Sequence, residues 1–269
     1  MKWLIGAISL IVAMFAISFI LGRGRSSAVN VLGSTSIQPF AGMLAQEFNK
    51  MHPDCLVDVQ GGGSTAGLEA ADTGIADIGT CSRALTPEEE KVFTPIVIAR
   101  DGLAIVVHPS NPVDNLSRER IRRMFTGEIT EWSQIPGYES FKRPIQLITR
   151  EEGSGTREAF MKLIMGQERV SRRALNQESN GAVKELVKHD PCAIGYMSLG
   201  LVQGELKMVR VDGRTPSAAA VKNETYPLVR PFLFVTKGPP DEQAKRFIDF
   251  VLSGPSQKTL EEEGLISAK

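Results

Sequence analysis

Strands and helices are expected to alternate along most of this chain, because short β-branched runs alternate with stretches of helical spacing. Residues 29–32 predict a strand, and Ile37, Phe40, Leu44 and Phe48 then fall on one face of a helix. Further strands are expected at 56–60, 75–79, 96–98 and 103–107, and a second helix at 65–71. The alternation predicts an α/β fold with mostly parallel sheets flanked by helices.

A turn-rich segment at residues 108–112, His-Pro-Ser-Asn-Pro, interrupts this alternation. Beyond it, strands are expected at 144–149, 193–196 and 233–236, and helices at 118–125, 181–189 and 241–252. At 269 residues the chain can hold two lobes of ordinary size. We therefore expect residues 109–211 to form a second lobe, and residues 29–108 and 212–269 to form the first.

The chain begins with an uncharged apolar run, residues 4–21, behind Met1-Lys2. Its length of about 18 residues exceeds that of a usual signal-peptide core and just suffices to span a bilayer. Small residues at 26–28 suit cleavage, whereas Arg23 and Arg25 are less usual before a cleavage site. Residues 1–28 are therefore expected to direct export, either as a cleaved signal peptide or as a retained membrane anchor.

The charge balance and the cysteines exclude several classes of function. Lys and Arg together number 31, as do Asp and Glu, so no basic excess suggests a nucleic-acid partner. Cys55, Cys81 and Cys192 cannot all pair within one chain, and they show no ligand spacing with the three histidines. Neither a metal nor another cofactor is expected, and any anion site must be local.

Three strand-to-helix turns are rich in glycine, serine and threonine, at residues 33–36, 61–65 and 153–156. The third follows Arg150, which ends an apolar strand, and residues 79–82 add another hydroxyl. In a parallel sheet, the turns after the strands lie at one edge, where ligands bind. Helix N-termini offer unpaired N–H groups there, and Arg150 offers a planar fork that suits a tetrahedral oxyanion. Together these features predict a site for a small oxyanion.

These turns match neither a nucleotide loop nor a serine hydrolase. Residues 61–67 lack the lysine of a P-loop and the spacing of a dinucleotide fingerprint. Ser64 and Ser154 do not lie in a Gly-x-Ser-x-Gly motif, and no histidine stands in a motif that would activate them. The pattern therefore indicates binding without catalysis.

Several segments together carry a family resemblance. In chain order they are Gly33-Ser34-Thr35-Ser36, Gly62-Gly63-Ser64, Cys81-Ser82-Arg83, residues 125–132 (Phe-Thr-Gly-Glu-Ile-Thr-Glu-Trp), Arg150 with Gly153-Ser154-Gly155-Thr156, and Gly195-Tyr196. From about Val29 to the C-terminus, this series resembles the phosphate-binding proteins of bacterial ABC phosphate transporters. The resemblance implies a two-lobed periplasmic-binding-protein fold that closes over one inorganic phosphate in the cleft between the lobes. It also implies delivery to a membrane-embedded ABC permease, and a monomer by analogy with the fold class.

The resemblance implies which residues bind phosphate. Backbone N–H and hydroxyl groups of the first two turns would bind from one lobe, and Arg150 with the third turn from the other. The expected ligand residues are Ser34, Thr35, Ser36, Ser64, Arg150, Ser154, Gly155 and Thr156. Glu152 resembles the acid that holds the family's arginine in place, although an ordinary carboxylate at a helix start accounts for it equally well.

One position departs from the family pattern. Where better-known members place an aspartate that accepts the phosphate proton, this chain has Ser82. A carboxylate accepts a hydrogen bond from protonated phosphate and repels sulfate, which keeps no proton at neutral pH. A hydroxyl donates as readily as it accepts, so Ser82 is a partial replacement. We hypothesise that Asp101 takes the acceptor role, the alternative being a turn-forming aspartate before Gly102.

Three other functions stay open at this point. Ser82 in place of the aspartate allows a receptor for another oxyanion, such as sulfate, molybdate or tungstate. The long apolar N-terminus allows a membrane-anchored phosphate sensor. A phosphoester hydrolase is disfavoured, because the sequence offers neither an activated nucleophile nor metal ligands.

Overall fold

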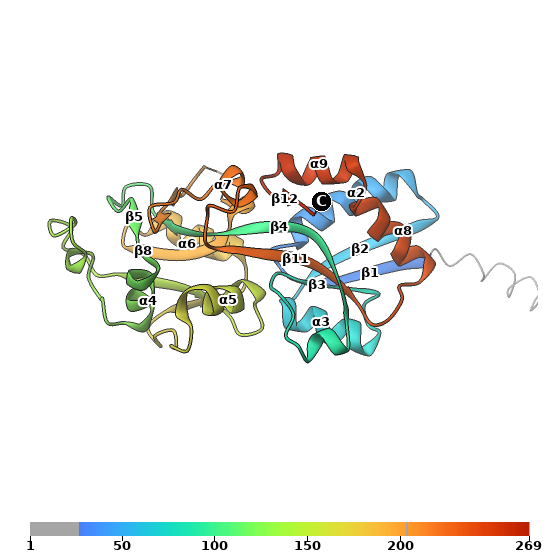
Figure 1. Ribbon diagram of the computed structural model, residues 1–269, viewed down its shortest axis with the longest axis horizontal. Coiled ribbons are helices and arrows are strands. Elements are labelled where there is room, and N and C mark those ends of the chain that lie inside the picture. Colours follow the sequence, from blue (N-terminus) through green and yellow to red (C-terminus); the bar gives the residue numbers. More distant parts are fainter. Residues whose placement is uncertain (1–26, 203, 269) are drawn as a thin grey trace, which may run out of the picture.

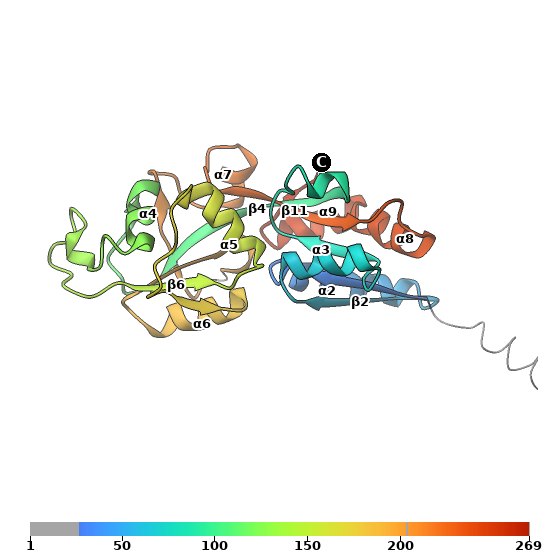
Figure 2. The ribbon, with the colours of Figure 1, turned by 90° about the horizontal axis from the view of Figure 1, so that it is seen from below.

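Two lobes lie end to end in the computed structural model, which describes residues 27–202 and 204–268 (Figure 1). Two long strands, β4 (Thr94–Val107) and β11 (Val229–Thr236), pair with each other and run from one lobe into the other. Figure 2 shows the same crossing from below. The α/β class and the two-lobed architecture expected from the sequence are confirmed.

Lobe 1, on the right of Figure 1, is built from both ends of the described chain. Its earlier elements are β1 (Ser27–Gly33), α2 (Gln38–Met51), β2 (Cys55–Gly61), α3 (Ser64–Thr73), β3 (Ile78–Cys81) and a 3-10 turn (Glu89–Lys91). Its later elements are α8 (Glu242–Val251), α9 (Gly254–Glu262) and β12 (Ile266–Ser267). One core joins both groups, since Val31 and Phe40 share a cluster with Phe232, Phe234 and Phe247.

Lobe 2 is built from the middle of the chain. Its helical elements are α4 (Arg118–Thr126), a 3-10 turn (Trp132–Gln134), α5 (Gly155–Phe160), a π-helical turn (Met161–Met165), α6 (Asn180–His189), a 3-10 turn (Leu199–Leu201) and α7 (Ala218–Lys222). Its strands are β5 (Asn115–Leu116), β6 (Gln146–Arg150), β7 (Leu175–Gln177), β8 (Ala193–Ser198), β9 (Lys207–Met208) and β10 (Arg210–Val211). The rings of Phe160 and Tyr196 stack at its centre with centroids 4.0 Å apart.

Most strands of both lobes belong to one sheet, and only β5 and β10 pair with each other apart from it among the described strands. Among the described residues, ten strands pair along the path β2-β1-β3-β11-β4-β8-β6-β7, with β9 and β12 on β4. The outer pairs are parallel, as expected, in both lobes. The central strands β4 and β11 pair antiparallel with each other and with their neighbours. This direction is required, because the chain leaves lobe 1 along β4 and returns along β11.

The packing of the core bears on where the two lobes divide. Leu103 and Ile105 lie in the same core cluster as Val221, Tyr226 and the other apolar residues of lobe 2. The expected boundaries at residues 109 and 212 would cut through this cluster. We propose instead that the lobes divide within β4, near Gly102, and at the start of β11.

Asp101 and Gly102 do not form the expected turn between two strands. They lie inside β4, which is continuous from residue 94 to residue 107. Asp101 pairs in register with Arg230 of β11, and both side chains are buried. A side chain at Gly102 would come within 2.9 Å of Leu199, so close packing is the reason for this glycine. The Asp-Gly pair therefore marks a tightly packed point in the crossing strand.

Capping side chains set the starts of several helices. Ser117, Ser154, Ser179 and Asp241 each accept a hydrogen bond from the backbone N–H group three residues later. The third strand begins at Ile78 rather than at the expected residue 75, where Ile75 is 69% exposed. The helices at 118, 180 and 242 thus begin within one residue of their expected starts, whereas this strand begins three residues later than expected.

The expected leader lies almost entirely outside the described residues, which begin at residue 27. Among the described helices, none combines the length and the apolar character needed to cross a bilayer.

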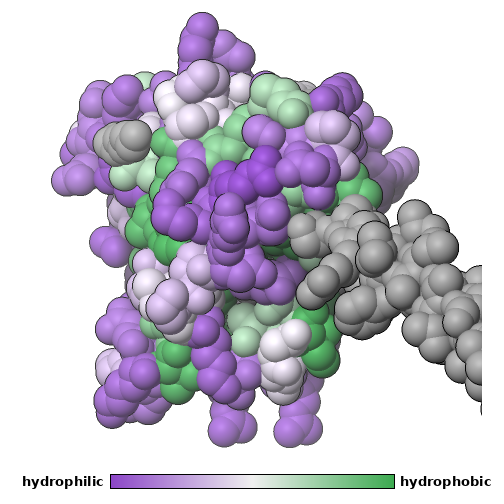
Figure 3. Space-filling view, turned by 90° about the vertical axis from the view of Figure 1, so that its right-hand side faces the viewer, coloured by the Kyte–Doolittle hydropathy of each residue, from purple (hydrophilic) through white to green (hydrophobic). Residues whose placement is uncertain are grey.

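The end of lobe 1 is covered mainly by hydrophilic side chains, with smaller hydrophobic areas between them (Figure 3). An ion pair between Arg246 of α8 and Asp54, 2.9 Å apart, contributes to the charged surface of lobe 1.

Candidate functional site

Arg150 ends β6 and faces lobe 1, with only 1% of its surface exposed. Its Nε donates to the Glu151 carboxylate at 2.9 Å and to the Gln177 carbonyl at 3.0 Å. Its Nη2 donates to Glu151 at 2.8 Å and to Thr35 Oγ1, across the lobes, at 3.0 Å. Its Nη1 is buried and has no hydrogen-bond partner among the described residues. A buried charged donor without a partner is costly, so this atom marks a place that suits an anionic acceptor.

The carboxylate that holds Arg150 belongs to Glu151, and the role expected for Glu152 is wrong. The N–H group of Glu151 still donates to the Gln177 carbonyl of β7, at 3.2 Å, which keeps its side chain beside the guanidinium. The next residue enters the turn before α5, where Gly153 has a φ of 82°, and Glu152 is exposed. The two glutamates are neighbours in the sequence, and the sequence pattern alone did not show which of them would bond to Arg150.

The turn after Arg150 brings backbone and hydroxyl groups against lobe 1. Ser154 caps α5 by accepting from the Arg157 N–H group at 3.3 Å. A Cβ atom at Gly155 would collide with Ser64 Oγ and lie 2.7 Å from Ser82 Oγ, so the backbone here passes directly over two serines of the other lobe. The absence of a side chain at Gly155 is what allows this approach.

The serines of lobe 1 form two linked pairs, and all four are buried. The Ser36 N–H group donates to Ser34 Oγ at 3.2 Å. The Ser82 N–H group donates to Ser64 Oγ at 3.1 Å, and the two hydroxyls are 3.5 Å apart. The turns after β1 and β3 and the start of α3 therefore converge, as expected for turns at one edge of a parallel sheet.

Hydroxyl groups of the two lobes meet directly. Ser36 Oγ lies 2.7 Å from Thr156 Oγ1, and Asn180 Nδ2 donates to Ser36 Oγ at 2.9 Å. Arg230 Nη1 donates to Thr156 Oγ1 at 2.7 Å. These groups, with Arg150, Thr35, Ser64, Ser82 and Ser154, are called the interlobe cluster below.

Sequence reasoning missed Arg230, Asn180 and Ser198. Of these three, only Arg230 could have been recognised in the sequence as a candidate site residue, because it is a charged residue within the mainly apolar strand β11. A charged residue buried in such a strand needs a partner. Asn180 joins the lobes through Ser36, and its Oδ1 accepts from the Ser198 N–H group at 3.0 Å. No motif distinguished this asparagine from an ordinary helix-start residue.

Asp101 is completely buried and bonded on both carboxylate oxygens. Oδ2 accepts from Arg230 Nε at 2.9 Å, and Oδ1 accepts from Ser198 Oγ at 2.9 Å. Burial raises the pKa of Asp101, and burial lowers the pKa of Arg230, while the attraction between the two opposes both shifts. The two groups form a buried ion pair in the strands that join the lobes.

The rim of the cluster carries a further contact between the lobes. Arg83 of lobe 1 lies 2.6 Å from Glu158 of α5 and 2.7 Å from Glu89. Burial raises the pKa of Glu158, and the neighbouring Arg83 opposes that shift. Beside them, the Thr65 N–H group donates across the lobes to a carbonyl of lobe 2 at 3.1 Å. The lobes are therefore in a closed arrangement.

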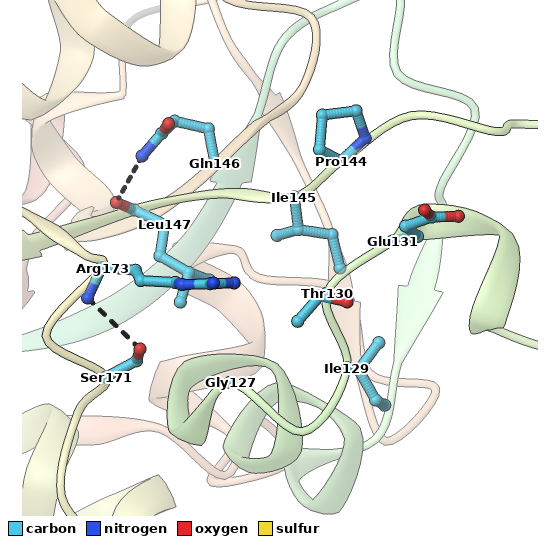
Figure 4. A pocket seen from close by; sticks show the side chains of 10 residues that line it. All are labelled: Gly127, Ile129, Thr130, Glu131, Pro144, Ile145, Gln146, Leu147, Ser171 and Arg173. Carbon is cyan, nitrogen blue, oxygen red and sulfur yellow. Dashed lines mark hydrogen bonds between the residues drawn. The ribbon is translucent and has the colours of Figure 1, made fainter.

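A separate hollow of about 330 Å³ lies in lobe 2 (Figure 4). It is lined by Gly127, Ile129, Thr130, Glu131, Pro144, Ile145, Gln146, Leu147, Ser171 and Arg173. None of these belongs to the interlobe cluster. Elsewhere in the described part of the chain, no group of three or more His, Cys, Asp and Glu residues is placed to hold a metal ion. The interlobe cluster, with its cations and hydroxyls, is the arrangement that suits a small oxyanion.

Comparison with known proteins agrees with this geometry. Residues 22–255 match the model of the PBP superfamily domain. The phosphate-binding protein PstS of Bacillus subtilis is 30% identical over 241 residues, covering 87% of this chain and 78% of the relative. This chain belongs to the PstS family of phosphate-binding proteins. The resemblance noted in the sequence is therefore confirmed.

Solved structures of this family have the same fold. A Clostridium perfringens protein, described as a phosphate ABC transporter substrate-binding protein and solved with bound phosphate, is 36% identical with a TM-score of 0.86. The alignment covers 90% of this chain and all of that one. An ABC-type phosphate transport receptor from Vibrio cholerae is 39% identical, with a TM-score of 0.75 over 88% of this chain and 99% of the receptor.

Proposed function

We propose that this protein captures one inorganic phosphate between its lobes and delivers it to an ABC permease. The observation that carries the proposal is the Nη1 atom of Arg150, a buried charged donor without a partner among the described residues, on a guanidinium whose Nη2 bonds to Thr35 of the other lobe. The relatives named for phosphate binding support the choice of ligand. The residues proposed to surround the phosphate are Ser34, Thr35, Ser36, Ser64, Ser82, Arg150, Ser154, Gly155 and Thr156.

The energetics favour an anion at this point. Ser36 and Thr156 now bond to each other, and an oxyanion between the lobes would accept from both hydroxyls as well as from Arg150. Hydrogen bonds to charged groups contribute about 1.5–3 kcal/mol each, against about 0.5–1.5 kcal/mol for neutral ones. Exchanging hydroxyl-to-hydroxyl contacts for contacts to an anion therefore stabilises the closed lobes. Phosphate would shift the population from an open form to this one.

The proposed role is binding without turnover. Ser64 and Ser154 are buried and bonded to backbone N–H groups. The three histidines bond elsewhere: His52 to Arg246, His108 to Ser110 and His189 to Glu185. Nucleophilic catalysis needs a base beside the hydroxyl. We propose a location outside the cytoplasmic membrane, as in other members of the family, and a monomeric receptor; a retained membrane anchor is the alternative to a cleaved leader.

Calorimetry with phosphate, sulfate, molybdate and tungstate tests the proposal. Phosphate is expected to bind best, and Arg150→Gln to weaken it by at least tenfold, since a charge-assisted bond is lost. Arg246→Gln, at an exposed ion pair of α8, is the control and should bind as the wild type does. Tighter binding of sulfate or molybdate would contradict the choice of phosphate. Turnover of a chromogenic phosphate ester would contradict a purely binding role.

A further inference from the structure

Arg230 lies where the two lobes join. It is in register with Asp101 across the antiparallel pair β11 and β4, the strands that run between the lobes (Figure 1). The side chains are 2% and 0% exposed. An arginine and an aspartate buried at this point are fixed by strand pairing, whereas the hydroxyls of the interlobe cluster stand on turns and helix starts. Strand pairing therefore holds Arg230 and Asp101 in place while the two lobes open and close around them.

One edge of the Arg230 guanidinium faces Asp101, and the other faces the interlobe cluster. Nε and Nη2 both lie 2.9 Å from Asp101 Oδ2. Nη1 donates to Thr156 Oγ1 of lobe 2 at 2.7 Å, and Nη2 lies 3.4 Å from Ser36 Oγ of lobe 1. Thr156 and Ser36 are the hydroxyls already proposed to contact the ligand. Arg230 thus has two N–H donors at the place where the lobes close.

Both carboxylate oxygens of Asp101 accept hydrogen bonds from protein groups and not from the proposed ligand. Oδ2 is occupied by Arg230, and Oδ1 accepts from Ser198 Oγ at 2.9 Å. A carboxylate that accepts a phosphate proton would need a free lone pair facing the ligand. The contacts of Asp101 instead resemble those of a counter-ion that holds a guanidinium in one orientation.

We propose that Arg230 is a second ligand-binding cation of this site, and that Asp101 positions it instead of accepting the phosphate proton. The inference rests on the proposed function. On closure, phosphate oxygens accept from the Arg230 N–H groups that now bond to Thr156 and Ser36. The ligand then bonds to arginines of both the crossing strands and lobe 2. Discrimination of the phosphate proton falls to hydroxyls such as Ser82, since Glu151 and Asp101 are both committed to arginines.

A double-mutant cycle tests the two roles together, using calorimetry with inorganic phosphate. Arg230→Gln is expected to weaken binding on the order of tenfold to a hundredfold, the loss of charge-assisted bonds. Asp101→Asn should weaken binding in the wild type and have less than about a twofold effect once Arg230 is replaced. An equal loss from Asp101→Asn in both backgrounds would mean that Asp101 acts on the ligand directly, and would overturn the positioning role.

The single variants each leave a buried charge without its partner, and either could fail to fold. The double variant Asp101→Asn/Arg230→Gln leaves none, and by itself it should show the tenfold to hundredfold loss. Phosphate binding by the double variant within about threefold of the wild type would overturn the proposal. Arg100→Gln, the neighbouring arginine on β4 with a 37% exposed side chain, is the matched control. A loss in this control as large as in Arg230→Gln would trace the effect to the strand and also overturn it.

The outcome also separates this inference from the proposed function. A wild-type protein that does not bind phosphate contradicts the proposed function itself. A wild-type protein that binds phosphate, with Arg230 variants that bind equally well, contradicts only the role of Arg230.

Discussion

Gly155→Ala should prevent the lobes from closing without unfolding either of them. A Cβ atom here would collide with Ser64 Oγ and come within 2.7 Å of Ser82 Oγ and 3.0 Å of Ser64 Cβ. Gly155 is not among the residues with positive φ, so alanine fits the local backbone of α5. The strain therefore acts only between the lobes, where it can be relieved by opening.

The cost can be worked from the contacts that opening would break. Three hydrogen bonds join the lobes beside Gly155: Thr65 N–H to the Gly153 carbonyl at 3.1 Å, Ser36 to Thr156 at 2.7 Å, and Arg150 to Thr35 at 3.0 Å. At about 0.5–1.5 kcal/mol for each of the two neutral bonds and about 1.5–3 kcal/mol for the bond from Arg150, their loss costs about 2.5–6 kcal/mol. Because about 1.4 kcal/mol corresponds to a factor of ten, phosphate affinity should fall by roughly a hundredfold to ten-thousandfold.

Calorimetry and thermal melting of the same samples measure the two effects separately. The melting temperature without phosphate should change little, whereas the stabilisation by phosphate should shrink. Gly42→Ala in α2, where no atom lies within 4 Å of the added carbon, is the control. Ser64→Gly combined with Gly155→Ala should restore part of the affinity by removing the colliding hydroxyl. If Gly155→Ala alone binds phosphate within about twofold of the wild type, the reasoning from closure is refuted.

Three further predictions concern stability and reactivity. Arg83 lowers the pKa of Glu89 below its ordinary value of 4.5. The ionised Glu89 therefore stabilises the fold above pH 4.5, and this contribution is lost as the pH falls through the lowered pKa. In acid denaturation, the stability of Glu89→Gln should depend less on pH in this range than that of the wild type. Trp132 is fully buried and donates to the Cys192 carbonyl at 3.0 Å, so Trp132→Ala should lower the free energy of unfolding in urea by about 3–5 kcal/mol; a loss below about 1 kcal/mol would contradict this. Burial raises the pKa of the Cys81 thiol, so it should react with a thiol reagent only after unfolding, as mass mapping of the labelled protein can check.

Local patterns predicted the elements that form by local rules. The apolar spacing of α2 and the capping serines are properties of a few neighbouring residues, and the helices lie close to their expected positions. The Gly-Ser-Thr turns also converge as expected, because parallel strands bring their following turns to one edge. This part of the fold and of the site follows from short segments of sequence.

The parts that depend on distant partners were not predictable in the same way. Asp101 looked like a turn residue before glycine, and only its pairing with Arg230, 129 residues later, makes it an interior strand residue. Arg230 itself stands in no motif, so its place in the site depends on which strand lies beside β11. Glu151 and Glu152 differ by one position, and the bend of the chain after β6 decides which of them reaches Arg150. Each of these outcomes is set by tertiary pairing.

The two crossing strands also determine the order in which the molecule can be completed. Lobe 2 comes from one unbroken stretch of chain, so all of its core residues between β4 and β11 emerge together. The core of lobe 1 needs Phe232, Phe234 and Phe247 beside Val29 and Val31, so it stays incomplete until nearly the whole chain has been made. A delay in completing this core keeps the chain extended for longer, which favours the export proposed above. Lobe 1 contains the N-terminal end of the described chain, yet its core cannot be completed before α8 and α9 have been made.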